Sequence, residues 1–334
     1  MSSGFFLLLV LLAKFSCRSG ALTVGAPDGL AEVGRSRLAA RGLAVVGTAK
    51  DADAVVVRSA TTVSDEWLAR HPRVKVVVRA GVGMDNVDVE ACRARGVGVA
   101  NTPFASTGAV AELAIAMILC ALRRLPQGHD AVRAGNFAAF KKAAEGREVS
   151  GKTLGLIGYG AIARRVEEMA RCLGLEVVHT SSRNINPAAA VKKKEKSLTP
   201  EEVFAVSDVV SIHVPLTSET ANLVDAELLS RGENVHLVNC ARGGVVVEGD
   251  VLRALDEGHL ATYSTDVFET EPPDPATDLL NHPLVFLSPH VGAATPETQD
   301  RIALAVADAV IALLLDDDDD FDEEEDPPTF RRLA

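Results

Sequence analysis

The sequence predicts an α/β protein made of two doubly wound parallel-sheet domains, and three observations support this expectation. The chain has 334 residues, enough for two domains of ordinary size. Hydrophobic residues make up 47% of it and aromatic residues 4%, so the cores must consist mainly of Val, Leu, Ala and Ile. Short runs of Val, Ile and Leu alternate with alanine-rich helical stretches, which is typical of buried parallel strands joined by helices.

The first α/β block covers residues 21–103. Its expected strands are Leu22–Val24, Ala54–Val57, Val74–Val78 and Val97–Ala100. Helices are expected between them, around Leu30–Ala40 and Val87–Arg95. This block has no glycine-rich phosphate loop. A long Ala/Leu helix over about Thr107–Leu122 follows, and its length suits a connector between domains.

The second α/β block begins at Lys152. Its expected strands are Thr153–Ile157, Glu176–Thr180, Val209–His213, Val235–Asn239, Thr262–Thr265 and Val285–Leu287. The last long helix, Pro296–Leu315, ends at an acidic run. We therefore expect a discontinuous domain of residues 21–103 and 293–315, and a second domain of residues 104–292.

The two ends of the chain differ in character. Residues 1–20 contain an unbroken apolar run, Phe5 to Ala13, which is too short for a membrane span of ~20 residues. It resembles the core of a targeting leader, to the secretory route or an organelle such as a plastid, although no Lys or Arg precedes it. An additional strand or a misassigned start is the alternative, and the compartment, cytoplasm or organelle, stays open.

Residues 316–334 predict a solvated, disordered acidic tail, with partner binding as an alternative role. The net charge is -12, but ten acids lie in this stretch, so the body is nearly neutral and has no basic stripe for nucleic acid. The five cysteines are scattered, which favours free thiols in a reducing compartment and no metal site. We expect a homodimer without a further regulatory domain.

A glycine-rich loop opens the second block. Residues 158–163 match G-x-G-x-x-G/A between an apolar strand and a helix, the setting in which this pattern binds a dinucleotide. The second glycine lets the backbone approach the pyrophosphate, and the helix N-terminus offers unpaired N–H groups. The expected cofactor-binding residues of this Rossmann-type loop are Gly158, Tyr159, Gly160, Ala161 and Ile162.

The tip of the next strand bears on cofactor choice. An acid that would bond the ribose hydroxyls of NAD is expected near position 181, where the sequence has Ser181, Ser182 and Arg183. Arg183 is a cation suited to a 2′-phosphate, which favours NADP over NAD. The alternative is that Arg183 is a solvated loop residue.

Three later segments complete a pattern: Val238–Gly244, Asp266–Pro273 and Ser288–Ala293. With the glycine loop they resemble the D-2-hydroxyacid dehydrogenase family over about residues 21–315. The stretches Val57–Thr61, Arg79–Asp88 and Asn101–Pro103 are most similar to its phosphoglycerate dehydrogenase branch. The resemblance implies a Rossmann cofactor domain and a flavodoxin-like substrate domain.

The chemistry explains the three residues that the resemblance identifies as catalytic. Arg242 offers a fixed guanidinium fork for carboxylate and carbonyl oxygens. His290 is the expected proton shuttle, because imidazole titrates near neutrality. Glu271, bonded to the other ring nitrogen, would orient His290 and favour its protonated form.

The resemblance implies further site residues. Asp266 matches the residue that holds the nicotinamide amide. The remaining expected cofactor residues are His213, Val214, Pro215, Cys240, Ala241 and Gly292. The expected substrate-binding residues are Arg58, Ser59, Arg79, Val82 and Gly83. Two departures from the family pattern are Val247, where Asp is common, and the short segment Thr48–Asp53.

The leading hypothesis for the activity is oxidation of D-3-phosphoglycerate to 3-phosphohydroxypyruvate, which the resemblance places first in serine synthesis. A glyoxylate/hydroxypyruvate reductase with the same machinery is the nearest alternative. A cofactor-sensing, corepressor-like binding protein of the same family is an alternative from another class, which turnover would distinguish.

Overall fold

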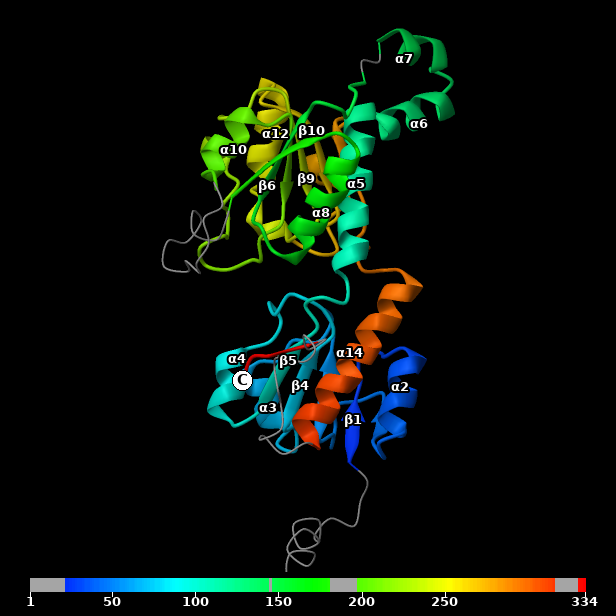
Figure 1. The fold of residues 1–334 in the computed structure, drawn as a ribbon, viewed down its shortest axis with the longest axis vertical. Coiled ribbons are helices and arrows are strands. Elements are labelled where there is room, and N and C mark those ends of the chain that lie inside the picture. The colour runs from blue at the N-terminus through cyan, green and yellow to red at the C-terminus, as the bar shows by residue number, and fades with distance from the viewer. Residues whose placement is uncertain (1–21, 144–145, 181–196, 316–329) are drawn as a thin grey trace, which may run out of the picture. The chain divides into compact units, whose positions relative to one another are not determined.

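The computed structural model describes residues 22–143, 146–180, 197–315 and 330–334. They divide into two compact units: unit 1, up to Ala105 and again from Gln299, and unit 2, Ser106–Thr298 (Figure 1). The predicted boundaries, after residues 103 and 292, lie a few residues earlier. Each unit has its own sheet with helices around it, as the α/β prediction required. The proposed leader, residues 1–20, lies outside the described residues.

Unit 1 has five parallel strands in the order β5-β4-β3-β1-β2. In chain order this is 2-1-3-4-5, the flavodoxin-like arrangement that the resemblance implied. The bounds are β1 (Thr23–Gly25), β2 (Ala44–Val46), β3 (Ala54–Val57), β4 (Val76–Arg79) and β5 (Gly98–Asn101). All four residues of β3 are buried, because helices cover both faces of the sheet. β2 was not predicted, and no helix lies between it and β3.

The helices of unit 1 pack in two layers (Figure 1). They are α2 (Glu32–Ala39), α3 (Asp65–Arg70), α4 (Val89–Ala94) and α14 (Pro296–Leu314). On one face, Trp67 of α3 and Cys92 of α4 share a core with residues of β3, β4 and β5. On the other, α2 meets α14 so closely that a Cβ on Gly34 would lie 2.6 Å from the carbonyl oxygen of Ala303.

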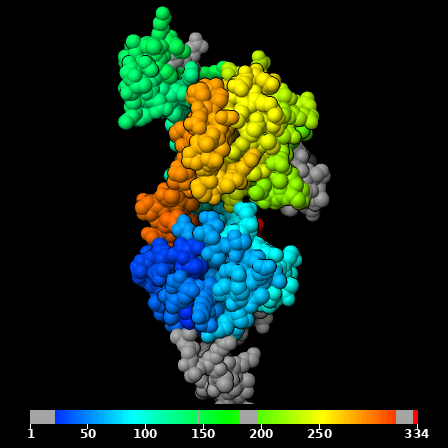
Figure 2. Space-filling view, turned by 180° about the vertical axis from the view of Figure 1, so that it is seen from behind, coloured from blue at the N-terminus to red at the C-terminus, as the bar shows by residue number. Residues whose placement is uncertain are grey.

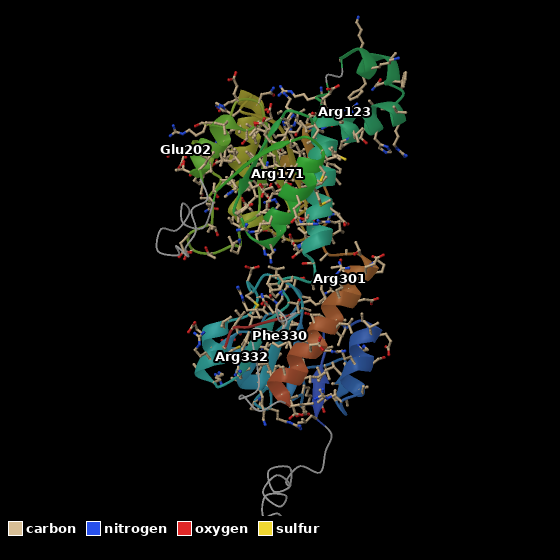
Figure 3. All side chains as sticks on the ribbon, viewed as in Figure 1. Arg123, Arg171, Glu202, Arg301, Phe330 and Arg332 are labelled. Carbon is tan, nitrogen blue, oxygen red and sulfur yellow. The ribbon has the colours of Figure 1, made fainter. Side chains whose placement is uncertain are left out.

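A sixth strand, β12 (Arg331–Arg332), pairs antiparallel with β5 and corrects one prediction. The disordered tail was predicted to extend through residue 334, which is wrong for residues 330–334. The Leu333 N–H donates to Val99 O at 2.6 Å. Phe330, which Figure 3 labels in unit 1, is 6% exposed. The segment is ordered because the edge of β5 offers unpaired backbone groups and Phe330 buries apolar surface. Residues 316–329 lie outside the described residues.

Unit 2 has six parallel strands in the order β11-β10-β9-β8-β6-β7. The bounds are β6 (Thr153–Ile157), β7 (Glu176–His179), β8 (Val209–Ile212), β9 (Val235–Asn239), β10 (Leu260–Thr265) and β11 (Val285–Leu287). The strand order reverses at β6 and β8, the point at which open α/β sheets bind ligands.

Helices cover both faces of this sheet. α5 (Thr107–Arg123) and α8 (Ala161–Cys172) share one core. The other face is covered by α10 (Pro200–Val206), α11 (Ala226–Leu229), α12 (Glu248–Glu257) and α13 (Asp278–Asn281). Two further helices, α6 (Leu125–Arg133) and α7 (Phe137–Ala143), project from the rest of unit 2 (Figures 1 and 2). In the part of the chain that is described, no helix is both long and apolar enough to cross a membrane.

Candidate active site

The glycine loop joins β6 to α8 in the geometry that a dinucleotide requires. Gly158 has φ +93°, and a Cβ there would lie 2.8 Å from the carbonyl oxygen of His213, so other residues are excluded. Gly160 is the N-cap of α8 and has open space where a Cβ would be. No side chain caps the helix, so its first-turn N–H groups remain available for a pyrophosphate. These residues therefore fit the predicted cofactor.

The side chain of Tyr159 is fixed within the same loop. Its ring stacks on that of His179 with centroids 3.7 Å apart, and the Arg164 guanidinium lies 4.1 Å above its centre. Its hydroxyl donates to Glu167. Burial raises the pKa of Glu167, but hydrogen bonds from Tyr159 and Arg171 outweigh it, so this pKa is lowered overall. Nearby, the Gly158 N–H donates to Thr180 Oγ1 at 3.0 Å, a contact that was not predicted.

The segment after β8 contains the expected residues His213, Val214 and Pro215. The His213 N–H donates to Ile157 O at 2.8 Å, and its Nε2 lies 2.9 Å from Ser211 Oγ. Burial lowers the pKa of His213 to about 4, so the ring is neutral at physiological pH. Ser181, Ser182 and Arg183 lie outside the described residues.

Asn239, the last residue of β9, shapes the loop that contains Arg242. Its Oδ1 accepts from the Ala241 N–H at 3.0 Å, and its Nδ2 donates to Arg242 O at 2.9 Å. This positioning role was not predicted, although an Asn at the end of a buried strand is a signal for such a turn. Burial, with a smaller effect of Asp266, raises the pKa of Cys240 to about 12, so its thiol is not a nucleophile near neutrality.

The Arg242 loop lies directly against the loop that follows β10. A Cβ on Gly243 would lie 1.9 Å from the carbonyl carbon of Phe268, so only glycine permits this approach. A reciprocal pair of hydrogen bonds reinforces it: the Glu248 N–H donates to Glu269 Oε1 at 2.8 Å, and the Glu269 N–H donates to Glu248 Oε1 at 2.9 Å. Arg242 and Glu271 are therefore held in neighbouring loops.

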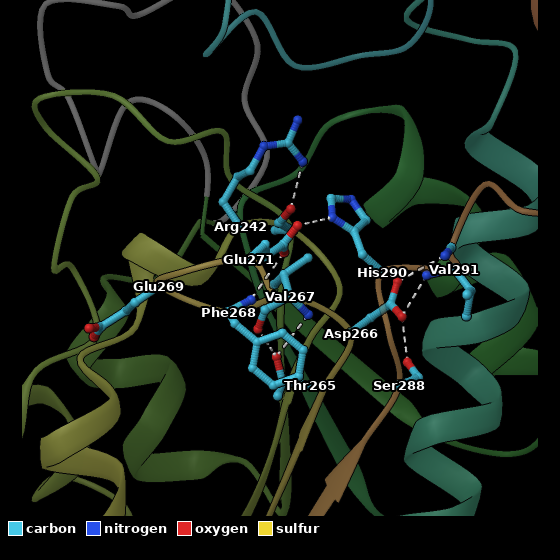
Figure 4. Close-up of polar contacts among 12 residues, drawn as sticks. Arg242, Thr265, Asp266, Val267, Phe268, Glu269, Glu271, Ser288, His290 and Val291 are labelled. Atoms are coloured by element: carbon cyan, nitrogen blue, oxygen red, sulfur yellow. Dashed lines mark hydrogen bonds and ion pairs between the residues drawn. The ribbon is translucent and has the colours of Figure 1, made fainter. Parts of the chain in front are cut away.

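His290 and Glu271 form a hydrogen-bonded pair (Figure 4). Nδ1 of His290 lies 2.7 Å from Oε2 of Glu271, and the other carboxylate oxygen accepts from the Phe268 N–H at 3.2 Å. The side chains are 44% and 37% exposed, so a substrate can reach the ring. The loop of Arg242 contacts the loop of Glu271 where Gly243 meets Phe268, and Arg242 Nη1 donates to Ala241 O at 2.7 Å (Figure 4). Unit 2 thus brings the three predicted catalytic residues together.

Asp266 organises the backbone around His290. It is 1% exposed and accepts from the N–H groups of Val291 at 2.9 Å and Gly292 at 2.8 Å, and from the Ser288 hydroxyl. His290 has φ +53°, a left-handed conformation uncommon outside glycine, which these contacts stabilise. The contact with Ser288 was not predicted.

The expected substrate residues follow two neighbouring strands of unit 1. Arg58 and Ser59 are exposed directly after β3, and Arg79 ends β4 with Nη1 donating to Ala80 O at 2.8 Å. Val82 and Gly83 come next, and Asn101 Nδ2 donates to Val82 O at 2.7 Å. Because β3 and β4 are parallel, both loops lie at the carboxyl end of this sheet. Among the described residues, no group of His, Cys, Asp or Glu could hold a metal ion.

Comparisons with known proteins agree with this geometry. Residues 115–292 match the family model described as D-isomer specific 2-hydroxyacid dehydrogenase, NAD binding domain. D-3-phosphoglycerate dehydrogenase of Bacillus subtilis is 39% identical over 260 residues, which are 78% of this chain and 49% of that protein. The chain therefore spans about half the length of the curated relatives it matches.

Solved structures show the same fold. A glyoxylate reductase from Paecilomyes thermophila superposes with a TM-score of 0.78 at 28% identity, covering 88% of this chain and 96% of that one. The NAD+-bound 3-phosphoglycerate dehydrogenase of Entamoeba histolytica gives a TM-score of 0.72 at 29% identity, covering 88% and 95%. With its NAD-binding domain and its assembled Arg, Glu and His, the chain belongs to the D-isomer-specific 2-hydroxyacid dehydrogenase family.

Proposed function

We propose that this protein is a nicotinamide-dependent dehydrogenase that oxidises D-3-phosphoglycerate to 3-phosphohydroxypyruvate. The observation that supports this most is the His290–Glu271 pair beside Arg242, at the carboxyl end of the sheet that carries the glycine loop. This reaction would be a first step of serine synthesis.

The roles of the three residues follow from their contacts. His290 presents Nδ1 to Glu271, so Nε2 is the nitrogen that accepts the proton of the substrate hydroxyl. The Glu271 carboxylate stabilises the imidazolium that results. Arg242 binds the substrate carboxylate through its planar guanidinium. The nicotinamide, when bound, supplies the hydride acceptor. In the reverse direction His290 protonates the keto oxygen.

Two candidate activities would use the same three catalytic residues and differ in their substrate. Similarity to the D-3-phosphoglycerate dehydrogenase of Bacillus subtilis favours phosphoglycerate as the substrate. Arg58 and Arg79 also suit a phosphorylated acid. The glyoxylate reductase structure keeps a glyoxylate/hydroxypyruvate reductase as the second candidate. A corepressor-like binding protein would bind the cofactor with negligible turnover.

The test is a steady-state comparison of phosphohydroxypyruvate, hydroxypyruvate and glyoxylate with each reduced cofactor. The proposal expects the highest kcat/KM for phosphohydroxypyruvate. Arg58→Ala should raise KM for that substrate about tenfold and leave glyoxylate unchanged, since one charge-assisted contact is lost. Arg70→Ala, at an exposed arginine of α3, is the matched control. Preference for glyoxylate, or no turnover at all, would support the alternatives.

We also propose a homodimer formed through α6 and α7. Three apolar side chains on these projecting helices are more than half exposed: Leu125, Val132 and Phe137. Phe137→Asp should shift the molar mass measured by light scattering from dimer to monomer. Val206→Asp, at an exposed apolar residue of α10, should not. A wild-type monomer at micromolar concentration would contradict the proposal.

A further inference from the structure

The loop after β3, residues 58–61, is held in place by two side chains from elsewhere in unit 1. Asp28, shortly after β1, accepts from three donors: the Arg58 N–H at 2.7 Å, the Thr61 N–H at 3.1 Å and the Thr61 hydroxyl at 2.7 Å. Asn86, in the loop after β4, donates through Nδ2 to Arg58 O at 2.5 Å and to Thr61 O at 2.6 Å. Both ends of this four-residue loop are therefore bonded.

The same arrangement leaves the middle of the loop available. The side chains of Arg58, Ser59 and Ala60 are exposed. The N–H groups of Ser59 and Ala60 have no hydrogen-bond partner among the described residues. A guanidinium followed by two unpaired backbone N–H groups is a set of donors for an anion with several oxygens.

The position of Asp28 is at first sight unfavourable for an anionic ligand. A carboxylate this close to the loop repels a phosphate, and the repulsion is substantial where water is partly excluded. The carboxylate of Asp28 also fixes the geometry of the loop. Its presence is explained if this geometry adds more to the free energy of ligand binding than the charge repulsion takes away.

We propose that Asp28, together with Asn86, is a positioning residue that orients Arg58, Ser59 and Ala60 to receive the phosphoryl group of the substrate. The inference rests on the proposed function, because it assigns the 58–61 loop to that group. Asp28 does not touch the substrate in this proposal. It acts through the backbone of Arg58 and through Thr61.

The test is Asp28→Asn. An amide oxygen at the place of Oδ2 still accepts from the two N–H groups, and the NH2 can donate to the Thr61 hydroxyl, but all three bonds lose the charge that strengthens them. KM for phosphohydroxypyruvate should rise about tenfold, as expected for one bond to a charged group. Turnover, NADH affinity and kcat/KM for glyoxylate should stay within about twofold. The control is Asp65→Asn, at an exposed acid of α3 in the same unit. It removes an equal charge and should leave KM for phosphohydroxypyruvate unchanged.

A double-variant cycle separates positioning from general damage. If Asp28 acts through Arg58, then Asp28→Asn in an Arg58→Ala background should raise KM much less than it does alone. Additive effects would overturn the inference, as would equal losses for phosphohydroxypyruvate and glyoxylate. Should Asp28→Asn fail to fold, Thr61→Val removes one donor to Asp28 and should raise KM about threefold for the phosphorylated substrate alone.

The two hypotheses fail in different ways. If Arg58→Ala leaves phosphohydroxypyruvate kinetics unchanged, the proposed phosphate site is wrong. If Arg58→Ala raises KM while both Asp28→Asn and Thr61→Val do not, the proposed function stands and the role of Asp28 is refuted.

Discussion

His290 and Glu271 are joined by a hydrogen bond of 2.7 Å between Nδ1 and Oε2, and the Phe268 N–H holds the other oxygen of the same carboxylate at 3.2 Å. The backbone thus orients the Glu271 carboxylate, and the carboxylate in turn orients the His290 ring. Because a carboxylate accepts hydrogen bonds, the neutral imidazole carries its proton on Nδ1. The ring therefore presents Nε2 as the base.

We expect His290→Ala to lower kcat by about 10²–10⁴-fold, the usual contribution of a general acid–base group, with little change in NADH affinity. Stopped-flow turnover and fluorescence titration measure the two quantities. Glu271→Gln should also lower kcat, because an amide NH2 next to Nδ1 favours the tautomer with the proton on Nε2. The decrease should be smaller than in His290→Ala, since the imidazole is still present. His129→Ala, at an exposed histidine of α6, is the control. Near-normal turnover in His290→Ala would refute the assignment.

Asp266→Asn should reduce both stability and turnover. The buried carboxylate accepts from Val291, Gly292 and Ser288, and an amide cannot accept from all three. We expect a loss of about 2–4 kcal/mol in the free energy of unfolding, because a buried donor is left unpaired. Ser288→Ala removes a single contact and should cost about 1 kcal/mol. Urea unfolding measures both, and equal losses would argue against a central role of Asp266.

Residues 330–334 should stabilise unit 1, although the sequence predicted a disordered tail through residue 334. Leu333→Pro removes the N–H that donates to Val99 O and should lower the free energy of unfolding by about 1–3 kcal/mol. Phe330→Ala should cost a similar amount through lost burial. Arg331→Ser, at an exposed strand position, is the control. Unchanged unfolding midpoints in both variants would mean that β12 contributes nothing.

Stability should decline as the pH falls below about 6.5, because His236 is buried in its neutral form. Its Nδ1 lies 2.8 Å from Thr262 Oγ1, and burial, assisted by Arg147, lowers its pKa to about 4. Between pH 6.5 and 4 the unfolded chain binds more protons than the native state, so protonation favours unfolding. The expected loss from pH 7.5 to 5 is about 2 kcal/mol for this residue. His236→Asn should flatten the profile, and an unchanged pH dependence would contradict the assignment.

The protein should accept NADPH at least as well as NADH. An acid at position 181 would bond the ribose hydroxyls of NAD and repel a 2′-phosphate, and the sequence has Ser181 there with Arg183 close by. One charge-assisted bond is worth about 1.5–3 kcal/mol, enough to reverse a tenfold preference. The test is kcat/KM for both cofactors in the wild type and in Ser181→Asp. A strong wild-type preference for NADH would contradict this prediction. So would a variant in which the ratio of kcat/KM for NADPH to that for NADH is unchanged.

The sequence by itself determined those features that depend on near neighbours. Continuous runs such as Ala54–Val57 predicted buried parallel strands, because strands covered on both faces are apolar throughout. Gly158 and Gly160 predicted a dinucleotide loop, because the strand, turn and helix that define it are contiguous. Arg242, Glu271 and His290 were identified through the resemblance of their three segments to a known family.

Tertiary structure alone decided which distant groups meet. Asp28 and Arg58 lie 30 positions apart, and nothing in either segment indicates that a carboxylate would bond the N–H of the other. β12 joins β5 although its sequence is short and charged, because pairing with an unfilled sheet edge depends on the partner strand rather than on local propensity. Gly243 against Phe268, and Asp266 against Gly292, likewise follow from the register of neighbouring parallel strands. Neighbouring parallel strands are joined by crossovers of about a dozen residues or more, so a local pattern does not contain their pairing.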